Sequence, residues 1–101
     1  MKIFMDIGDT KYVREAIEQI FTTTGQLEFV SKVQEADAII VSDPEKVEVY
    51  LEHTDKRVAQ LLWWKQRPST APQGDRFKVF DALEAKKLPG LIEAIKFLKG
   101  E

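Results

Sequence analysis

Three aspartates lie at the ends of two apolar segments, where they could do chemistry. Asp6 and Asp9 lie at the end of the apolar run of residues 3–7, and Asp43 closes the run of residues 37–43. In a doubly wound sheet, ligands collect outside the carboxyl ends of the strands, where the strand order reverses. If the two runs are neighbouring parallel strands, the three carboxylates meet there and offer the oxygen ligands that Mg²⁺ prefers. A metal ion beside Asp43 would allow that carboxylate to accept a phosphoryl group.

The same acids are also explained as helix caps. Asp43 is followed by Pro44 and Glu45, and a capping acid, a proline at the first position and an acid in the first turn are typical of a helix start. Asp9 can cap a helix over residues 11–23 in the same way. A cap of this kind stabilises a helix by about 1 kcal/mol and needs no ligand. The residues leave both interpretations open.

Hydrophobic spacing indicates the elements that must position these acids. Continuous β-branched or apolar runs predict buried strands, and we expect five of them, over residues 3–7, 27–30, 37–43, 58–64 and 77–80. Apolar residues at helical spacing predict longer helices, which we expect over residues 11–23, from residue 44 onward, and over 89–99. Capping-box patterns at Ser31–Gln34 and at Asp81–Glu84 predict two further short turns.

The alternation of strands and helices predicts the fold class. We expect a single α/β domain over residues 1–101, with three layers and a five-stranded, mostly parallel sheet in the order 2-1-3-4-5, as in flavodoxin-like folds. The direction of the fifth strand is left open. Residues 65–76 contain Pro68, Pro72 and Gly74 and show no apolar period. They predict an exposed loop in place of the helix between strands four and five.

Composition excludes several classes of function. The chain has 101 residues, a net charge of -2, no cysteine and one histidine, His53. These numbers exclude thiolate catalysis, cysteine-based metal sites and a multi-histidine site within one chain, and they argue against nucleic-acid binding, which needs a basic field. No secretory signal or membrane-spanning run is evident, so we expect a cytoplasmic protein that does not bind membranes.

Two adjacent tryptophans suggest a contact surface. Trp63 and Trp64 lie in the fourth predicted strand, so their side chains point to opposite faces of the sheet. If the helix after this strand is missing, one indole is exposed and marks a partner-binding surface, together with Arg67. Alternatively, residues 65–76 fold back and cover both rings.

The β/α alternation is combined with the segment Asp37-Ala38-Ile39-Ile40-Val41-Ser42-Asp43. In these two features the chain resembles a response-regulator receiver domain. The resemblance implies Asp43 as the phosphoacceptor and Asp6, with Asp9, as Mg²⁺ ligands. The family's acids after strand one are adjacent, whereas Ile7 and Gly8 separate Asp6 from Asp9 here. The Trp63-Trp64-Lys65 region replaces the family's hydroxyl residue, and Lys87-Leu88-Pro89 comes later than the family's lysine. The match is therefore to a degenerate receiver, or pseudo-receiver.

Two functions from different classes follow. The favoured one is a non-enzymatic, receiver-like signalling module, without a cofactor, that docks another protein or a second copy of itself through the side formed by strands four and five. The alternative is a Mg²⁺-dependent phosphoryl-accepting domain or a small phosphate-handling enzyme that uses Asp43 with Asp6 and Asp9. A small-ligand binder at the same cleft is a third possibility.

Overall fold

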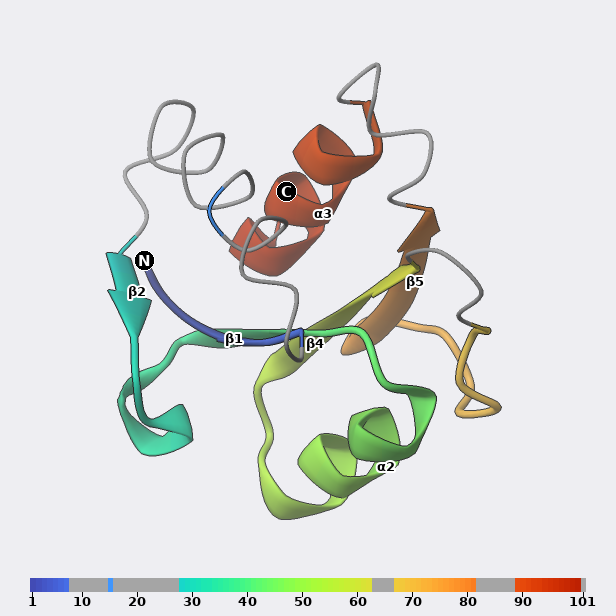
Figure 1. Cartoon of the computed structure of the whole chain (residues 1–101), viewed down its shortest axis with the longest axis horizontal. Helices are drawn as coiled ribbons and strands as arrows, with labels where there is room; N and C mark the ends of the chain where they lie inside the picture. Colours follow the sequence, from blue (N-terminus) through green and yellow to red (C-terminus); the bar gives the residue numbers. More distant parts are fainter. Residues whose placement is uncertain (8–14, 16–27, 63–66, 82–88, 101) are drawn as a thin grey trace.

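Five parallel strands form one sheet at the centre of the molecule (Figure 1). The computed structural model describes residues 1–7, 15, 28–62, 67–81 and 89–100. The strands, in the order in which they lie in the sheet, are β2 (Glu28–Val30), β1 (Lys2–Asp6), β3 (Ala38–Val41), β4 (Arg57–Leu62) and β5 (Phe77–Asp81). The predicted order 2-1-3-4-5 is confirmed, and β5 runs parallel to β4. The architecture is that of a flavodoxin-like α/β fold.

Helices lie on both faces of the sheet, since parallel crossovers carry the chain over one face or the other. In Figure 1, α3 (Pro89–Lys99) lies above the sheet and α2 (Pro44–His53) lies below it. A 3-10 helix, η1 (Val33–Glu35), connects β2 to β3. The predicted short turn before Ala36 is confirmed by η1, but the capping box at Ser31 is wrong, because Lys32 precedes η1 with no side-chain cap hydrogen bond. The predicted helix over residues 11–23 and the turn over 82–87 lie outside the described residues.

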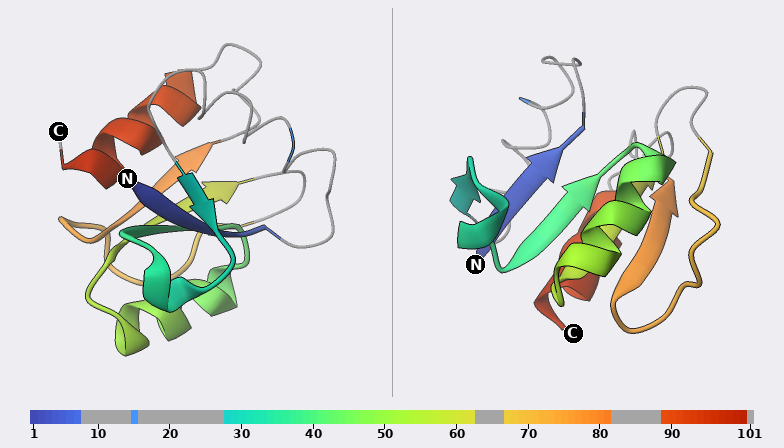
Figure 2. Two further views of the ribbon diagram at one scale, coloured as in Figure 1. Left: turned by 90° about the vertical axis from the view of Figure 1, so that its left-hand side faces the viewer. Right: turned by 90° about the horizontal axis from the view of Figure 1, so that it is seen from below.

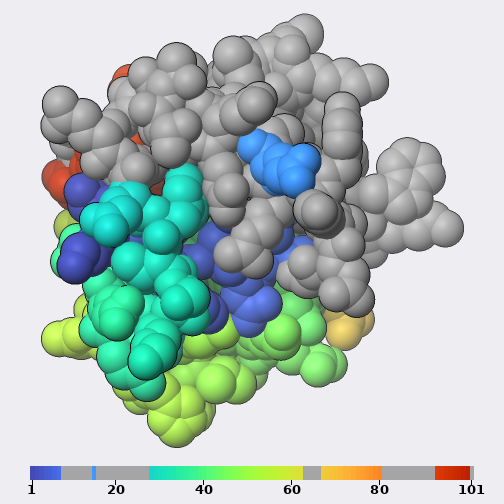
Figure 3. Space-filling model, turned by 60° about the vertical axis from the view of Figure 1, so that its left-hand side comes forward, coloured from blue at the N-terminus to red at the C-terminus, as the bar shows by residue number. Residues whose placement is uncertain are grey.

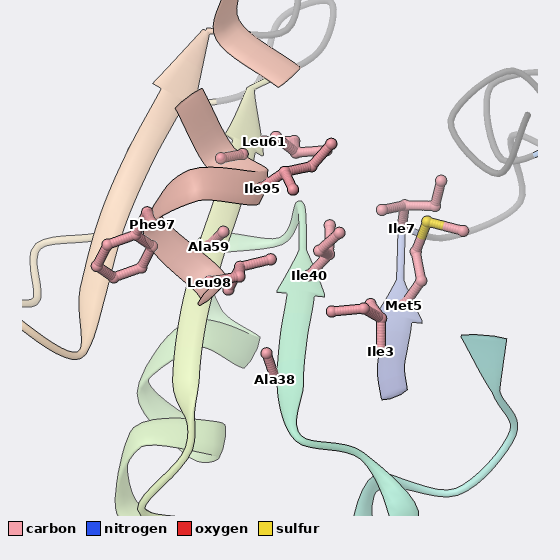
Figure 4. Packing of buried hydrophobic residues seen from close by; sticks show 11 residues of the cluster. Ile3, Met5, Ile7, Ala38, Ile40, Ala59, Leu61, Ile95, Phe97 and Leu98 are labelled. Carbon is pink, nitrogen blue, oxygen red and sulfur yellow. The ribbon is translucent and has the colours of Figure 1, made fainter. Parts of the chain in front are cut away.

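Alternation along the strands divides the core into two clusters. Odd-numbered residues of β1 and even-numbered residues of β3 face α3 and pack against its buried face (Figure 4). The alternate residues of β3, Ile39 and Val41, pack with Val47 of α2 on the other face. All four residues of β3 are buried, as its continuous apolar run predicts for a strand covered on both faces.

Two arginines at the amino ends of β4 and β5 donate hydrogen bonds to backbone carbonyl oxygens at the carboxyl-terminal ends of α3 and α2. Arg76 donates to the carbonyl oxygens of Leu51 (3.2 Å) and Thr54 at the end of α2. Arg57 donates to the carbonyl oxygen of Phe97 in the last turn of α3, 2.8 Å away. Gly100 then ends α3 with a φ of 82°. A cation near the last carbonyls of a helix also interacts favourably with its dipole.

Among the described residues, the face of the sheet that carries α2 has less helical cover than the same face of a standard three-layer fold. The chain passes from β2 to β3 through the three-residue η1, and residues 67–76 precede β5 as an irregular segment beside that strand (Figure 2). The predicted loop in place of a helix between β4 and β5 is confirmed for its described part, residues 67–76. As a result, α2 stands between η1 and this loop. In the described part of the chain, none of the helices has the length and apolarity to cross a membrane.

Candidate functional site

The carboxyl ends of β1 and β3 lie side by side. Asp6, the last residue of β1, is in register with Val41 of β3, and the backbone N–H of Ser42 donates to the carbonyl oxygen of Asp6 at 3.3 Å. Asp43 follows one residue later. The two aspartates therefore belong to neighbouring strand ends on one edge of the sheet, which is the arrangement that the strand order predicts.

The Asp6 carboxylate is held by two side chains of α2. Lys46 Nζ lies 3.3 Å from Oδ1, and the Tyr50 hydroxyl donates to Oδ2 at 2.7 Å. The Asp6 side chain is 20% exposed, whereas that of Lys46 is 50% exposed. Burial, followed by the hydrogen bond to Asp6 and its negative charge, raises the pKa of the Tyr50 phenol well above its usual range. Both oxygens of this carboxylate thus have partners within the fold.

Tyr50 itself is fixed by packing against the sheet. Its ring meets Phe4 of β1 edge to face, with the centroids 6.0 Å apart, an arrangement that aromatic pairs favour. Phe4 and Tyr50 both pack on the core cluster beneath α2. The Tyr50 hydroxyl is therefore positioned at Asp6 by the same contacts that seat the helix.

Asp43 caps the amino end of α2. Its Oδ1 accepts the backbone N–H of Glu45 at 2.9 Å, and Pro44 occupies the first helical turn. Its carbonyl oxygen accepts the backbone N–H groups of Lys46 and Val47. The capping interpretation from the sequence is confirmed. The role of Asp43 as a phosphoacceptor stays a prediction.

The described residues contain no group of three or more histidine, cysteine, aspartate or glutamate side chains that is arranged to hold a metal ion. Asp9, the third ligand of the predicted Mg²⁺ site, lies outside the described residues. Of the predicted ligands, the structure describes Asp6 and Asp43, and a metal ion there would compete with Lys46 and Tyr50 for Asp6.

A buried glutamine joins the sheet to the loop before β5. Gln60 of β4 has no exposed surface. Its Nε2 donates to the carbonyl oxygens of Ser42 (3.1 Å) and Arg67 (3.0 Å), and its Oε1 accepts the backbone N–H of Ser69 at 2.8 Å. Gln60 was not predicted from the sequence as a functional residue. The available signal was a single amide within the apolar run Val58–Leu62, because a polar side chain inside a buried strand requires partners.

The predicted partner-binding residues lie in and before this loop. Arg67 is exposed, and it lines a hollow of about 270 Å³ with Pro44, Glu45, Glu48, Pro68 and Thr70. The Thr70 hydroxyl donates to Oε1 of Glu48 across this hollow at 3.0 Å. Trp63 and Trp64 lie outside the described residues.

A second hollow flanks α2 on the opposite side, next to η1. Its volume is about 380 Å³, and its lining includes Val33, Val49, Tyr50, His53 and Lys56. Figure 3 shows part of β1 (dark blue) between the β2–η1 segment (cyan) and α2 (green). The helix α2 is therefore a ridge between two hollows, each at a place where the chain has no long helix among its described residues.

The chain matches no family model, no curated protein and no solved structure. The fold and the contacts at the carboxyl edge of the sheet must therefore support any proposal about function.

Proposed function

We propose that this chain is a non-enzymatic, receiver-like interaction module that docks a protein partner through the side formed by β4, β5 and residues 67–76. The observation that carries the proposal is that the two carboxylates at the strand ends already bond to other groups of the fold. Asp6 is bonded to Lys46 and Tyr50, and Asp43 caps α2. Carboxylates that serve as structural partners favour a scaffold over a catalytic centre.

Residues 67–76 support docking because most of them are exposed and because hydrogen bonds join them to β4 and β5. Gln60 fixes the loop at Arg67 and Ser69, and further along the loop Oε1 of Gln73 accepts the backbone N–H of Val79 in β5 at 3.0 Å. An ordered loop loses little conformational entropy on binding. Arginine is also enriched at protein interfaces, and Arg67 lies beside the hollow next to α2.

The alternative is a phosphoryl-accepting domain that uses Asp43 and Mg²⁺. The adjacency of the β1 and β3 carboxyl ends favours it, because Asp6 and Asp43 lie at the same edge of the sheet. Metal binding would then have to displace Lys46 from Asp6.

A titration with Mg²⁺ and beryllofluoride separates these two functions. Amide chemical shifts and tryptophan fluorescence are followed for the wild type and for Asp43→Asn, since asparagine caps a helix about as well as aspartate but cannot accept a phosphoryl group. The interaction module is expected to give no saturable response in either protein. A saturable response in the wild type that is lost in Asp43→Asn would overturn the non-enzymatic proposal.

The docking side is tested with a purified partner, identified by its retention on the wild-type protein and then rebound in isolation. Arg67→Glu is expected to weaken that binding at least tenfold. Lys96→Glu, which reverses an exposed charge on α3 on the other face of the sheet, is the matched control and is expected to leave binding unchanged. Equal affinities of the two variants would place the partner elsewhere on the molecule.

A further inference from the structure

The outward face of α2 carries an exposed valine. Val49 is 49% exposed, more than any other large hydrophobic residue whose side chain the structure describes. Successive residues of a helix are rotated by about 100°, so Val47 and Leu51 lie on the side of α2 opposite to Val49. Val47 is fully buried and Leu51 packs on the same core cluster. Val49 therefore points directly away from the sheet.

Charges of opposite sign flank Val49 on its two sides. Glu45 and Glu52, at positions i-4 and i+3, lie on one side of the helix face. Lys46 and His53, at positions i-3 and i+4, lie on the other. All four are exposed. Lys46 bonds to Asp6 but keeps half of its side chain exposed. The face thus has an apolar centre, an acidic side and a basic side, and the formal positive charge of the basic side is that of Lys46.

We infer that this face binds a second copy of the chain, with the two α2 helices side by side and pointing in the same direction. A two-fold axis parallel to the helices sets Val49 against Val49 of the partner subunit. It also sets the acidic side of each helix against the basic side of the other, so that Glu45 faces the partner's Lys46 and Glu52 faces the partner's His53. Such self-complementarity is what a two-fold interface requires.

The opposite orientation is disfavoured by the same charges. In an antiparallel pair, the two-fold axis is perpendicular to the helices and like sides meet. The acidic Glu45 would then face the partner's acidic Glu52. Like charges in contact across an interface are destabilising, so the charge pattern selects the parallel pair.

The hollow next to η1 leaves space for the partner's side chains on the basic side of α2. Val49, His53 and Lys56 contribute to its lining, and in the parallel pair the partner's acidic side lies over it. Paired helices pack about 8–10 Å apart. One apolar residue and a rim of charges make a small interface, and interfaces below about 1,200 Å² are typical of transient association. We therefore expect a weak dimer whose population rises with protein concentration and falls with salt.

Disulfide trapping tests the inferred face, because the chain has no cysteine of its own. Val49→Cys is expected to form a disulfide-linked dimer at least tenfold faster than Lys96→Cys, which is also an exposed helical position, on α3. Equal rates would overturn the inference. In the wild type, the average mass in sedimentation is expected to rise with concentration, and Val49→Asp is expected to abolish that rise. A wild-type mass that stays monomeric at all concentrations would also overturn it.

A second substitution tests the direction of the helices. Glu45→Lys in the Val49→Cys background is expected to slow cross-linking several-fold, since it sets a lysine against the partner's Lys46. In an antiparallel pair the new lysine would face the partner's Glu52 and speed cross-linking, which would refute the parallel arrangement. Arg67 lines a hollow together with Glu45, so the dimer is tested through Val49, whose substitutions leave the partner-binding residue Arg67 unchanged.

Discussion

The replacement of Gln60 by leucine is the most informative perturbation of the loop before β5. The Gln60 side chain has no exposed surface and makes three hydrogen bonds to backbone groups, those of Ser42, Arg67 and Ser69. Leucine approximates its volume and removes all three bonds. Two carbonyl oxygens and one amide N–H then lose their side-chain partner.

The cost of Gln60→Leu follows from where each bond lies. The bond to Ser42 is buried, and an unsatisfied buried group costs about 1–3 kcal/mol. The bonds to Arg67 and Ser69 are partly buried. Water can take the place of these two bonds. The loss of each one therefore lowers the free energy of unfolding by about 0.5–1.5 kcal/mol, the net contribution of a typical hydrogen bond. The sum is about 2–6 kcal/mol, a large share of the roughly 5–15 kcal/mol that stabilises a domain.

Urea unfolding followed by tryptophan fluorescence measures this loss. The matched control is Gln73→Leu, because Oε1 of Gln73 also accepts a backbone N–H at 3.0 Å, but in an exposed position. We expect the control to lose less than about 1 kcal/mol. If the two variants lose equal free energies of unfolding, the buried network does not anchor the loop and the reasoning is refuted. Faster amide hydrogen exchange at Ser69 in Gln60→Leu would locate the effect in the loop.

Two further predictions concern the carboxyl edge of the sheet. Asp43→Ala is expected to destabilise the domain by about 0.5–2 kcal/mol through loss of the α2 cap, while Asp43→Asn retains most of the stability; thermal unfolding of both variants checks this, and equal losses would contradict the capping role. Tyr50 has a raised pKa in the folded state, so the unfolded chain releases the phenolic proton first as pH rises, and stability falls above about pH 10, the ordinary tyrosine pKa. Tyr50→Phe lacks this contribution, and urea midpoints measured between pH 8 and 11 should fall less steeply for the variant than for the wild type; parallel curves would argue against a Tyr50 phenol that is held by burial and by Asp6.

Local signals in the sequence predicted much of the fold. The β-branched run that ends near Asp43 predicted the buried strand β3, and Pro44 after a capping acid predicted the start of α2. The helix over residues 89–99 was predicted with the bounds that α3 has. Capping, periodicity and proline geometry act over a few neighbouring residues, so one stretch of sequence contains the information that each of these elements needs.

The sequence by itself therefore determined the strands and helices named above. The strand order came from analogy with flavodoxin-like folds, because right-handed crossovers fix the face that each helix covers and not the order of the strands. Tertiary structure alone decided the partners of the polar side chains. Asp6 meets Lys46 and Tyr50 across 40 and 44 residues of chain, and Gln60 reaches the end of β3 across 18 residues. Such contacts depend on which strands adjoin and which face each side chain takes, because a hydrogen bond forms only when folding brings both groups within about 3 Å.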